Sequence, residues 1–128
     1  MSNVYSAHCL CGAEHIEAKG EPKWVRWCHC ESCRRHSGGP TNVFVSFPND
    51  AVTITKGSIA KYSSSPGVER GFCARCGSTL TCASVRLSTE THYYVGVFER
   101  AAELKPTGEF FAGERLPWLP AHDGSSAS

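Results

Sequence analysis

The densest group of chemically reactive side chains lies in residues 28–36, where Cys28, Cys30 and Cys33 fall within six residues. Thiols this close in sequence are poorly placed for unstrained disulfides with one another. They can converge on one soft cation, because thiolates bind zinc in a tetrahedral shell with bonds of about 2.3 Å. Three protein ligands leave one exchangeable position, as in catalytic zinc sites, whereas four make a closed structural site. The triplet Cys28, Cys30 and Cys33 is therefore a candidate catalytic zinc site.

Two further cysteine pairs lie on either side of this triplet. Cys73 and Cys76 are followed by Gly77, which is the spacing of a zinc knuckle, a tight turn that presents two thiolates. Cys9 and Cys11 are two residues apart, and in a strand such residues share a face. Together the pairs predict a closed structural zinc with four sulfur ligands. The alternative is a redox dithiol, and the lack of a βαβ pattern around Cys73 argues against it.

The residues alone leave the fourth ligand of the triplet open. Cys82 lies in an alternating β segment, where a cysteine is typically a small buried hydrophobic residue. His29 or His36 could complete the shell, which would give two structural zincs and no enzyme. Arg34 and Arg35 follow the triplet. They would either offset its negative charge and receive a substrate carboxylate or be solvated surface charges.

The elements that must position these side chains are short strands separated by turn residues. The β-prone segments are residues 4–7, 13–18, 24–27, 43–47, 52–55, 59–62, 68–72, 78–83 and 92–98. A helix around residues 31–36 has at most two turns, because the Ser-Gly-Gly-Pro run at 37–40 cannot continue it. We predict a mainly β fold, a small single domain of short antiparallel strands with little helix. Its core is thin, so zinc is expected to supply part of the folding free energy.

Length and composition restrict the class of protein. The chain has 128 residues, which suits one domain. Its formal net charge is +1, from 13 basic and 12 acidic residues, which disfavours nucleic acid and anionic membranes as partners. The sequence starts without a signal-peptide pattern and has no apolar run near the roughly 20 residues that span a bilayer. With eight cysteines in metal-type clusters, this predicts a cytoplasmic protein in a reducing compartment.

The three cysteine blocks and the tail resemble the glutathione-dependent formaldehyde-activating enzyme (GFA) family, whose fold is similar to Mss4-like zinc domains. The resemblance covers nearly the whole chain. It implies one GFA-type zinc-binding domain over residues 1–121, followed by a disordered tail at 122–128. The matching motifs are Cys9-x-Cys11-Gly12, Cys28-His29-Cys30-x-x-Cys33-Arg34, Phe72-Cys73-x-x-Cys76-Gly77-x-x-Leu80 and the segment from Pro106 to Trp118.

The resemblance implies two zinc ions per chain. Cys28, Cys30 and Cys33 would hold a functional zinc with an open position. It also implies an S-(hydroxymethyl)glutathione synthase-like activity, a carbon–sulfur lyase in its formal direction, with glutathione as co-substrate. One departure is in the tail, where relatives often carry a histidine and this chain has Glu109 among residues 108–111. The structural zinc would be held by Cys9, Cys11, Cys73 and Cys76.

The implied chemistry is reasonable for three thiolates. They leave zinc with a local charge of −1 and make it a soft acceptor for a fourth sulfur. A substrate thiol, whose pKa is about 8.5 in water, loses its proton on coordination and can add to a small aldehyde. The expected partners are therefore a small thiol and an aldehyde. The alternatives are a non-catalytic zinc module for a protein or nucleic-acid partner, and a redox or metal-buffering protein.

Overall fold

The computed structural model describes residues 3–120, so the predicted tail at 122–128 lies outside the described residues. The fold is mainly β, as the sequence predicts, with one α-helix among these residues, α1 (Glu31–Ser37). Short 3-10 turns join several of the strands. The strands are β1 (Val4–His8), β2 (His15–Lys19), β3 (Trp24–Cys28), β4 (Asn42–Pro48), β5 (Val52–Lys56), β6 (Ala60–Ser65), β7 (Val68–Phe72), β8 (Thr79–Ser84), β9 (Glu90–Tyr94) and β10 (Glu109–Phe110).

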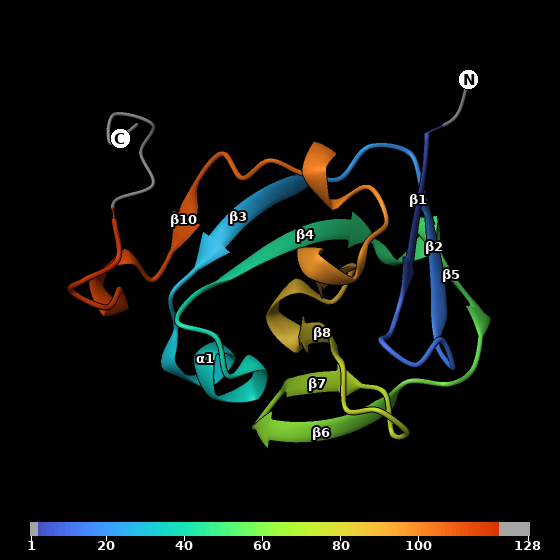
Figure 1. Cartoon of the computed structure of the whole chain (residues 1–128), viewed down its shortest axis with the longest axis horizontal. Coiled ribbons are helices and arrows are strands. Elements are labelled where there is room, and N and C mark those ends of the chain that lie inside the picture. Colours follow the sequence, from blue (N-terminus) through green and yellow to red (C-terminus); the bar gives the residue numbers. More distant parts are fainter. Residues whose placement is uncertain (1–2, 121–128) are drawn as a thin grey trace.

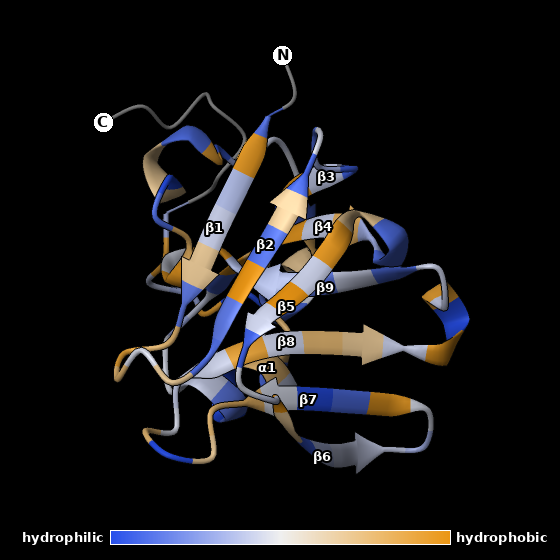
Figure 2. Ribbon diagram, turned by 90° about the vertical axis from the view of Figure 1, so that its right-hand side faces the viewer, coloured by the Kyte–Doolittle hydropathy of each residue, from blue (hydrophilic) through white to orange (hydrophobic). Residues whose placement is uncertain are grey.

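The strands form two sheets (Figure 1). The small sheet has the order β1-β2-β5, and the large sheet has the order β10-β3-β4-β9-β8-β7-β6. Neighbouring strands are antiparallel except β10, which pairs in parallel with β3. Figure 2 shows the small sheet lying across one face of the large one. This arrangement leaves the other face of the large sheet for the triplet.

The main core fills the space between the two sheets. Val45 and Phe47 of β4 and Tyr93 of β9 meet Tyr5 and Ile16 of the small sheet in one buried cluster. Because strand residues alternate between faces, only every second residue of β4 and β9 joins this core. Burial of one such aromatic side chain contributes about 1.5–3 kcal/mol.

The opposite face of the large sheet carries a second buried cluster. Phe44 of β4 and Tyr94 of β9 pack there with Cys28 and Cys33. Phe44 precedes the core residue Val45 by one position, so strand alternation turns it to this face. The same alternation therefore places the triplet against a packed aromatic surface.

Helix α1 is a short helix, as expected. Its N-cap is Cys30, whose thiol accepts a hydrogen bond from the backbone N–H of Cys33 at 3.2 Å. It ends at Gly38, which adopts a left-handed conformation with φ of 79°. Glycine tolerates this conformation without a side-chain clash, which explains why the helix stops there.

Two predictions of local structure are wrong. Strand β9 ends at Tyr94, and Val95–Val97 form a 3-10 turn closed by the N–H of Phe98, so the predicted strand 92–98 is interrupted despite its β-branched residues. Strand β1 ends at His8, so Cys9 lies in a turn and not on a strand face. Gly12 closes that turn by donating its N–H to the Cys9 carbonyl. In both places, local turn hydrogen bonds prevail over strand propensity.

Candidate functional site

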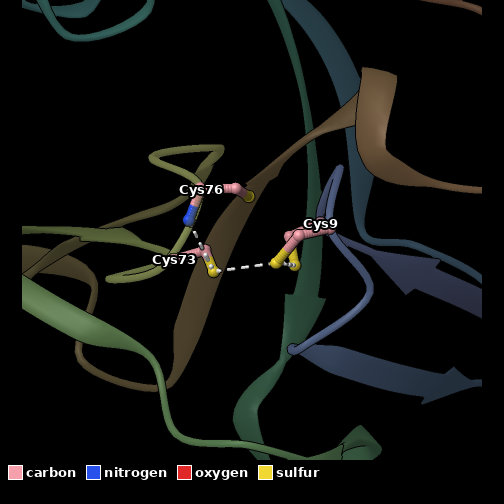
Figure 3. Close-up of side chains that lie close together, drawn as sticks. Cys9, Cys73 and Cys76 are labelled. Atoms are coloured by element: carbon pink, nitrogen blue, oxygen red, sulfur yellow. Dashed lines mark hydrogen bonds between the residues drawn. The ribbon is translucent and has the colours of Figure 1, made fainter.

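Four cysteine side chains converge from two turns that are distant in sequence. Their four sulfur atoms all lie within 4.8 Å of one another. Figure 3 shows Cys9 approaching from the turn after β1, and Cys73 and Cys76 from the turn between β7 and β8. The sulfur of Cys11 lies 3.7 Å from that of Cys9 and 3.8 Å from that of Cys73. A tetrahedral zinc shell with bonds of about 2.3 Å separates its sulfurs by about 3.8 Å, so the donor set fits zinc.

The second turn is shaped to favour thiolates. The backbone N–H groups of Arg75 and Cys76 both donate to the Cys73 sulfur, at 3.4 and 3.5 Å. Hydrogen bonds from Ser78 lower the pKa of Cys76 to about 5. Metal ligands of this type bind in the deprotonated form, so these contacts suit a metal site.

The triplet is positioned by the end of β3 and the start of α1. Cys28 is the last residue of β3, Cys30 caps α1 and Cys33 lies in its first turn. The three sulfur atoms lie within 4.8 Å of one another, and those of Cys28 and Cys33 are 3.7 Å apart, again a separation that suits zinc. Between residues 3 and 120, no fourth histidine, carboxylate or cysteine side chain joins this group.

The two nearby histidines are used elsewhere. His29 is fully buried; its Nε2 lies 3.0 Å from Glu109 Oε1 and its Nδ1 lies 3.1 Å from Thr41 Oγ1. His36 Nδ1 lies 2.9 Å from the hydroxyl of Tyr94. The alternative in which a histidine completes the triplet is therefore not the arrangement seen here. Glu109 is the tail residue that departs from the family pattern. Its contact with His29 links β10 to the segment that carries the triplet.

A buried arginine from β7 lies against the triplet. The Nη1 atom of Arg70 donates a hydrogen bond of 3.3 Å to Cys33 Sγ, and its Nε donates to Ser64 Oγ at 3.1 Å. Burial disfavours the charge of Arg70, but the hydrogen bond to Cys33 and the nearby negative charges of Cys82, Cys33 and Tyr94 together outweigh it and raise the pKa of the guanidinium. The thiols of Cys28 and Cys30, together with Arg70, lower the pKa of Cys33 to about 7. The surroundings thus favour negative charge on the Cys33 sulfur, whereas hydrogen bonds with Cys30 and Cys33, together with burial, raise the pKa of Cys28.

A cavity of about 590 Å³ opens beside the triplet. Its walls are largely apolar, with Phe44 and Leu87 among them, and the tail adds Phe110. Charged and polar groups on the walls include Arg70, Arg86 and His92. A cavity of this size with a few polar groups is typical of a small-molecule site.

The family profile described as glutathione-dependent formaldehyde-activating enzyme (GFA) matches residues 4–114. The chain belongs to the GFA family. An uncharacterized lyase of Schizosaccharomyces pombe is 38% identical to this GFA protein over 76 residues, which are 59% of this chain and 55% of the relative. The chain thus spans about half the length of that curated relative.

A crystal structure of a Rhodobacter sphaeroides protein shares the fold of this GFA protein. The TM-score is 0.66 at 20% sequence identity, and the match covers 82% of this chain and 99% of that one. No helix within residues 3–120 combines the length and the apolar character needed to cross a membrane.

The two arginines proposed from the sequence lie outside the cavity of this GFA protein. Arg35 is exposed and pairs with Glu31 on the same helix, at 2.6 Å. Arg34 and Arg35 line a separate groove with Trp118, which is itself 69% exposed. Their role in binding a substrate stays a prediction, and the cavity itself offers Arg70 and Arg86 in their place.

Cys82 has a different environment from the one its strand position suggested. It is half-buried and lines the cavity, where a hydrogen bond with Cys33 lowers its pKa to about 7. Sequence reasoning missed Arg70 and His92 because each reaches the site through strand pairing. In the register of the large sheet, Arg70 faces Cys82, and Cys82 faces His92.

Proposed function

We propose that this GFA-family chain is a zinc-dependent carbon–sulfur lyase that acts on the adduct of a glutathione-like thiol with a small aldehyde. The observation that carries this is the triplet, whose three sulfur atoms lie within 4.8 Å of one another beside a cavity of about 590 Å³. Among residues 3–120, Cys82 hydrogen-bonds to Cys33 but does not belong to that group, so the proposal takes the fourth position as open to substrate. Membership of the GFA family and a relative named as a lyase support the same class of reaction. A cytoplasmic location, where thiols stay reduced, is part of the proposal.

The zinc of the active site would be held by Cys28, Cys30 and Cys33. Their sulfur separations suit its tetrahedral shell. When bound, the ion would lower the pKa of a substrate thiol, since coordination favours the thiolate. The four-cysteine group would hold a second, structural zinc that joins a turn of the small sheet to a turn of the large one.

Residues that line the cavity provide the charge and the apolar surface that a thiol adduct requires. Arg70 balances negative charge at the triplet through its bond to Cys33. Arg86 lines the same cavity and is available for a substrate carboxylate. The largely apolar walls, Phe44 among them, are typical of a small-molecule site. In the lyase direction the carbon–sulfur bond breaks and the hydroxyl proton leaves, which gives a thiol and an aldehyde.

The proposal is tested with ¹³C-formaldehyde, glutathione and the metal-loaded protein. Exchange NMR measures how fast formaldehyde and its glutathione adduct interconvert, and the protein is expected to accelerate this exchange. Cys30→Ser should lose the acceleration, while Lys19→Gln, a change at an exposed end of β2, should retain it. The proposal would be contradicted if the metal-loaded protein did not accelerate exchange between glutathione and formaldehyde, or between glutathione and any of a panel of other small aldehydes.

A further inference from the structure

Strand β9 carries a carboxylate–histidine pair, and its histidine lines the cavity. Glu90 and His92 are two residues apart in β9, so both side chains are on the same face of the sheet. His92 Nε2 lies 2.9 Å from Glu90 Oε2. His92 lines the cavity that also contains the triplet. His92 is therefore placed where a bound substrate would be, and Glu90 contacts it from within the protein.

Glu90 is held as an anion. It is only 6% exposed, Ser46 Oγ donates to its Oε2 at 2.8 Å, and Lys23 Nζ lies 2.8 Å from its Oε1. Burial would raise the pKa of this carboxyl, but hydrogen bonds from Lys23, His92 and Ser46 outweigh it and lower the pKa to about 2. At neutral pH the carboxylate can only accept hydrogen bonds.

This fixes the tautomer of His92. Because Glu90 only accepts, Nε2 of His92 carries the proton in their shared hydrogen bond. Nδ1 of the neutral ring then has a free lone pair, and it makes no hydrogen bond to the residues that the structure describes. A ring nitrogen in this state can accept a proton from a bound molecule.

The ring is also fixed in orientation. Trp24 contacts it edge to face, with ring centroids 4.6 Å apart, and Phe44 lies 6.4 Å away on the neighbouring strand. A base held by packing and by a hydrogen bond at its other nitrogen is preorganised for proton transfer, because little motion is needed when substrate binds.

We propose that His92 is the catalytic base of the lyase reaction, with Glu90 as its positioning residue; this rests on the proposed function. Nδ1 of His92 takes the hydroxyl proton of the adduct. The O–H electrons form the carbonyl of the aldehyde, and the carbon–sulfur pair leaves with the sulfur as a thiolate. The imidazolium then returns its proton to solvent. In the direction of synthesis, the imidazolium donates this proton to the aldehyde oxygen.

The charge state of His92 depends on groups from several strands. Burial lowers the pKa of His92, Glu90 partly opposes this, and Lys23 lowers the pKa further. The base form therefore predominates at pH 7. The charged groups that act on the ring are Glu90 on β9 and Lys23 before β3, and Cys82 on β8 is its partner in the sheet register. Arg26 on β3 lies over the neighbouring Trp24 ring, whereas β4 presents Phe44 and Ser46 and β10 presents Phe110.

The test compares the metal-loaded wild type with His92→Gln, with breakdown of the formaldehyde–glutathione adduct as the assay. A lost general base should lower kcat by roughly 100-fold or more. Metal content, melting temperature and the binding of glutathione should not change. His8→Gln, at an exposed histidine of β1, serves as the matched control and should keep the wild-type rate.

The pH profile separates a base from a merely structural histidine. The wild-type rate should fall as the pH drops through the pKa of His92, below the ordinary value of 6.5. Glu90→Gln removes the group that raises this pKa, so the acid limb should move to lower pH. His92→Gln should lack that limb in whatever activity remains.

The outcomes distinguish the two proposals. An active wild type beside a folded His92→Gln with the same rate and the same acid limb overturns the role of His92 alone. A wild type without lyase activity overturns the proposed function and, with it, this role. If His92→Gln is too unstable to assay, ¹⁵N NMR of the wild type decides: a proton on Nε2 and a midpoint matching the acid limb support the proposal, and a proton on Nδ1 contradicts it.

Discussion

Arg70 illustrates how one buried side chain sets the charge of the proposed active site. Three thiolates and a divalent ion carry a net charge of −1, and the guanidinium of Arg70 brings the assembly to neutrality. The three thiols are neutral when protonated, so this guanidinium stabilises the metal-bound form relative to the metal-free form. Arg70 is 6% exposed, which keeps the interaction from being screened by solvent.

We expect Arg70→Met to weaken metal binding at the triplet. A hydrogen bond to a charged group contributes about 1.5–3 kcal/mol, which corresponds to roughly 10-fold to 100-fold in affinity. Competition with a chromophoric chelator measures this directly on the folded protein. Arg75→Met is the control, because Arg75 is exposed and adjoins the other cysteine group. Equal resistance of the wild type and Arg70→Met to the chelator would contradict the prediction.

At this scale the sequence predicts the sulfur donors but not the groups around them. The thiols of Cys28, Cys30 and Cys33 are neighbours along the chain, so their spacing alone indicates a shared ion. Arg70 and His92 lie far from them in sequence and reach the cavity through the register of β7, β8 and β9. A shift of one residue in that register would turn each side chain to the opposite face. Only the paired sheet could reveal them.

Among the elements, β9 links the core to the cavity. Tyr93 packs between the sheets, while Glu90 and His92 lie on the opposite face of the large sheet. Glu90 also connects three segments, since its carboxylate contacts Ser46 on β4 and Lys23 before β3. A buried anion with this many partners stabilises the folded state as long as it stays ionised.

Glu90→Gln is therefore expected to lower stability in a pH-dependent way. The folded-state pKa of Glu90 is about 2, compared with an ordinary value of 4.5, so its contribution is present above pH 4.5 and is lost as the pH falls toward 2. A shift of this size corresponds to on the order of 3 kcal/mol. Urea unfolding from pH 7 to pH 3 should show the gap between wild type and variant closing with acid.

The exposed residue Glu69 provides the control for that experiment. Glu69→Gln should unfold like the wild type at each pH, including any loss of metal in acid, which affects all the proteins alike. A constant gap between Glu90→Gln and the wild type over this range would show that the carboxylate does not titrate as described.

Element prediction succeeded where strand patterning was local. The N-terminal hairpin, the short helix and most strands follow from alternation and turn residues. Strand β10 was missed because it has only two residues and is parallel to β3, a pairing that no local pattern signals. It matters to the site, because Glu109 contacts His29 and Phe110 lines the cavity.

At the scale of the whole molecule, the two cysteine groups have different structural positions. The four-cysteine group joins the turn after β1 in the small sheet to the turn before β8 in the large one. The triplet lies at the end of one strand and the start of the helix that follows it. A metal at the first group would stabilise the packing of the sheets, whereas a metal at the second would act locally.

Cys73→Ser is expected to unfold the protein, and Cys30→Ser is expected to leave it folded. Binding of a structural zinc contributes on the order of 10 kcal/mol, comparable with the whole stability of a small domain. Cys73 is fully buried, so replacing it removes one of the four ligands of the proposed structural site from the protein interior. At position 30, serine can still cap the helix. Circular dichroism and metal content of the same samples test both expectations.

Equal loss of β structure in the two variants would show that the triplet is also a structural site. A Cys73→Ser protein with wild-type thermal stability would remove the structural role from the four-cysteine group. Either result would contradict the proposal that the four-cysteine group is structural and the triplet functional.

The separation of the ligands also bears on how the chain matures during synthesis. Cys11 and Cys73 are 62 residues apart, and at about 5–20 residues per second the ribosome needs roughly 3–12 s to make the intervening chain. The first thiol pair emerges long before its partner pair, whereas the triplet emerges nearly at once. The nascent chain can therefore acquire a metal at the triplet before its two sheets are joined. Translation would thus complete the ligand set of the triplet before that of the four-cysteine group.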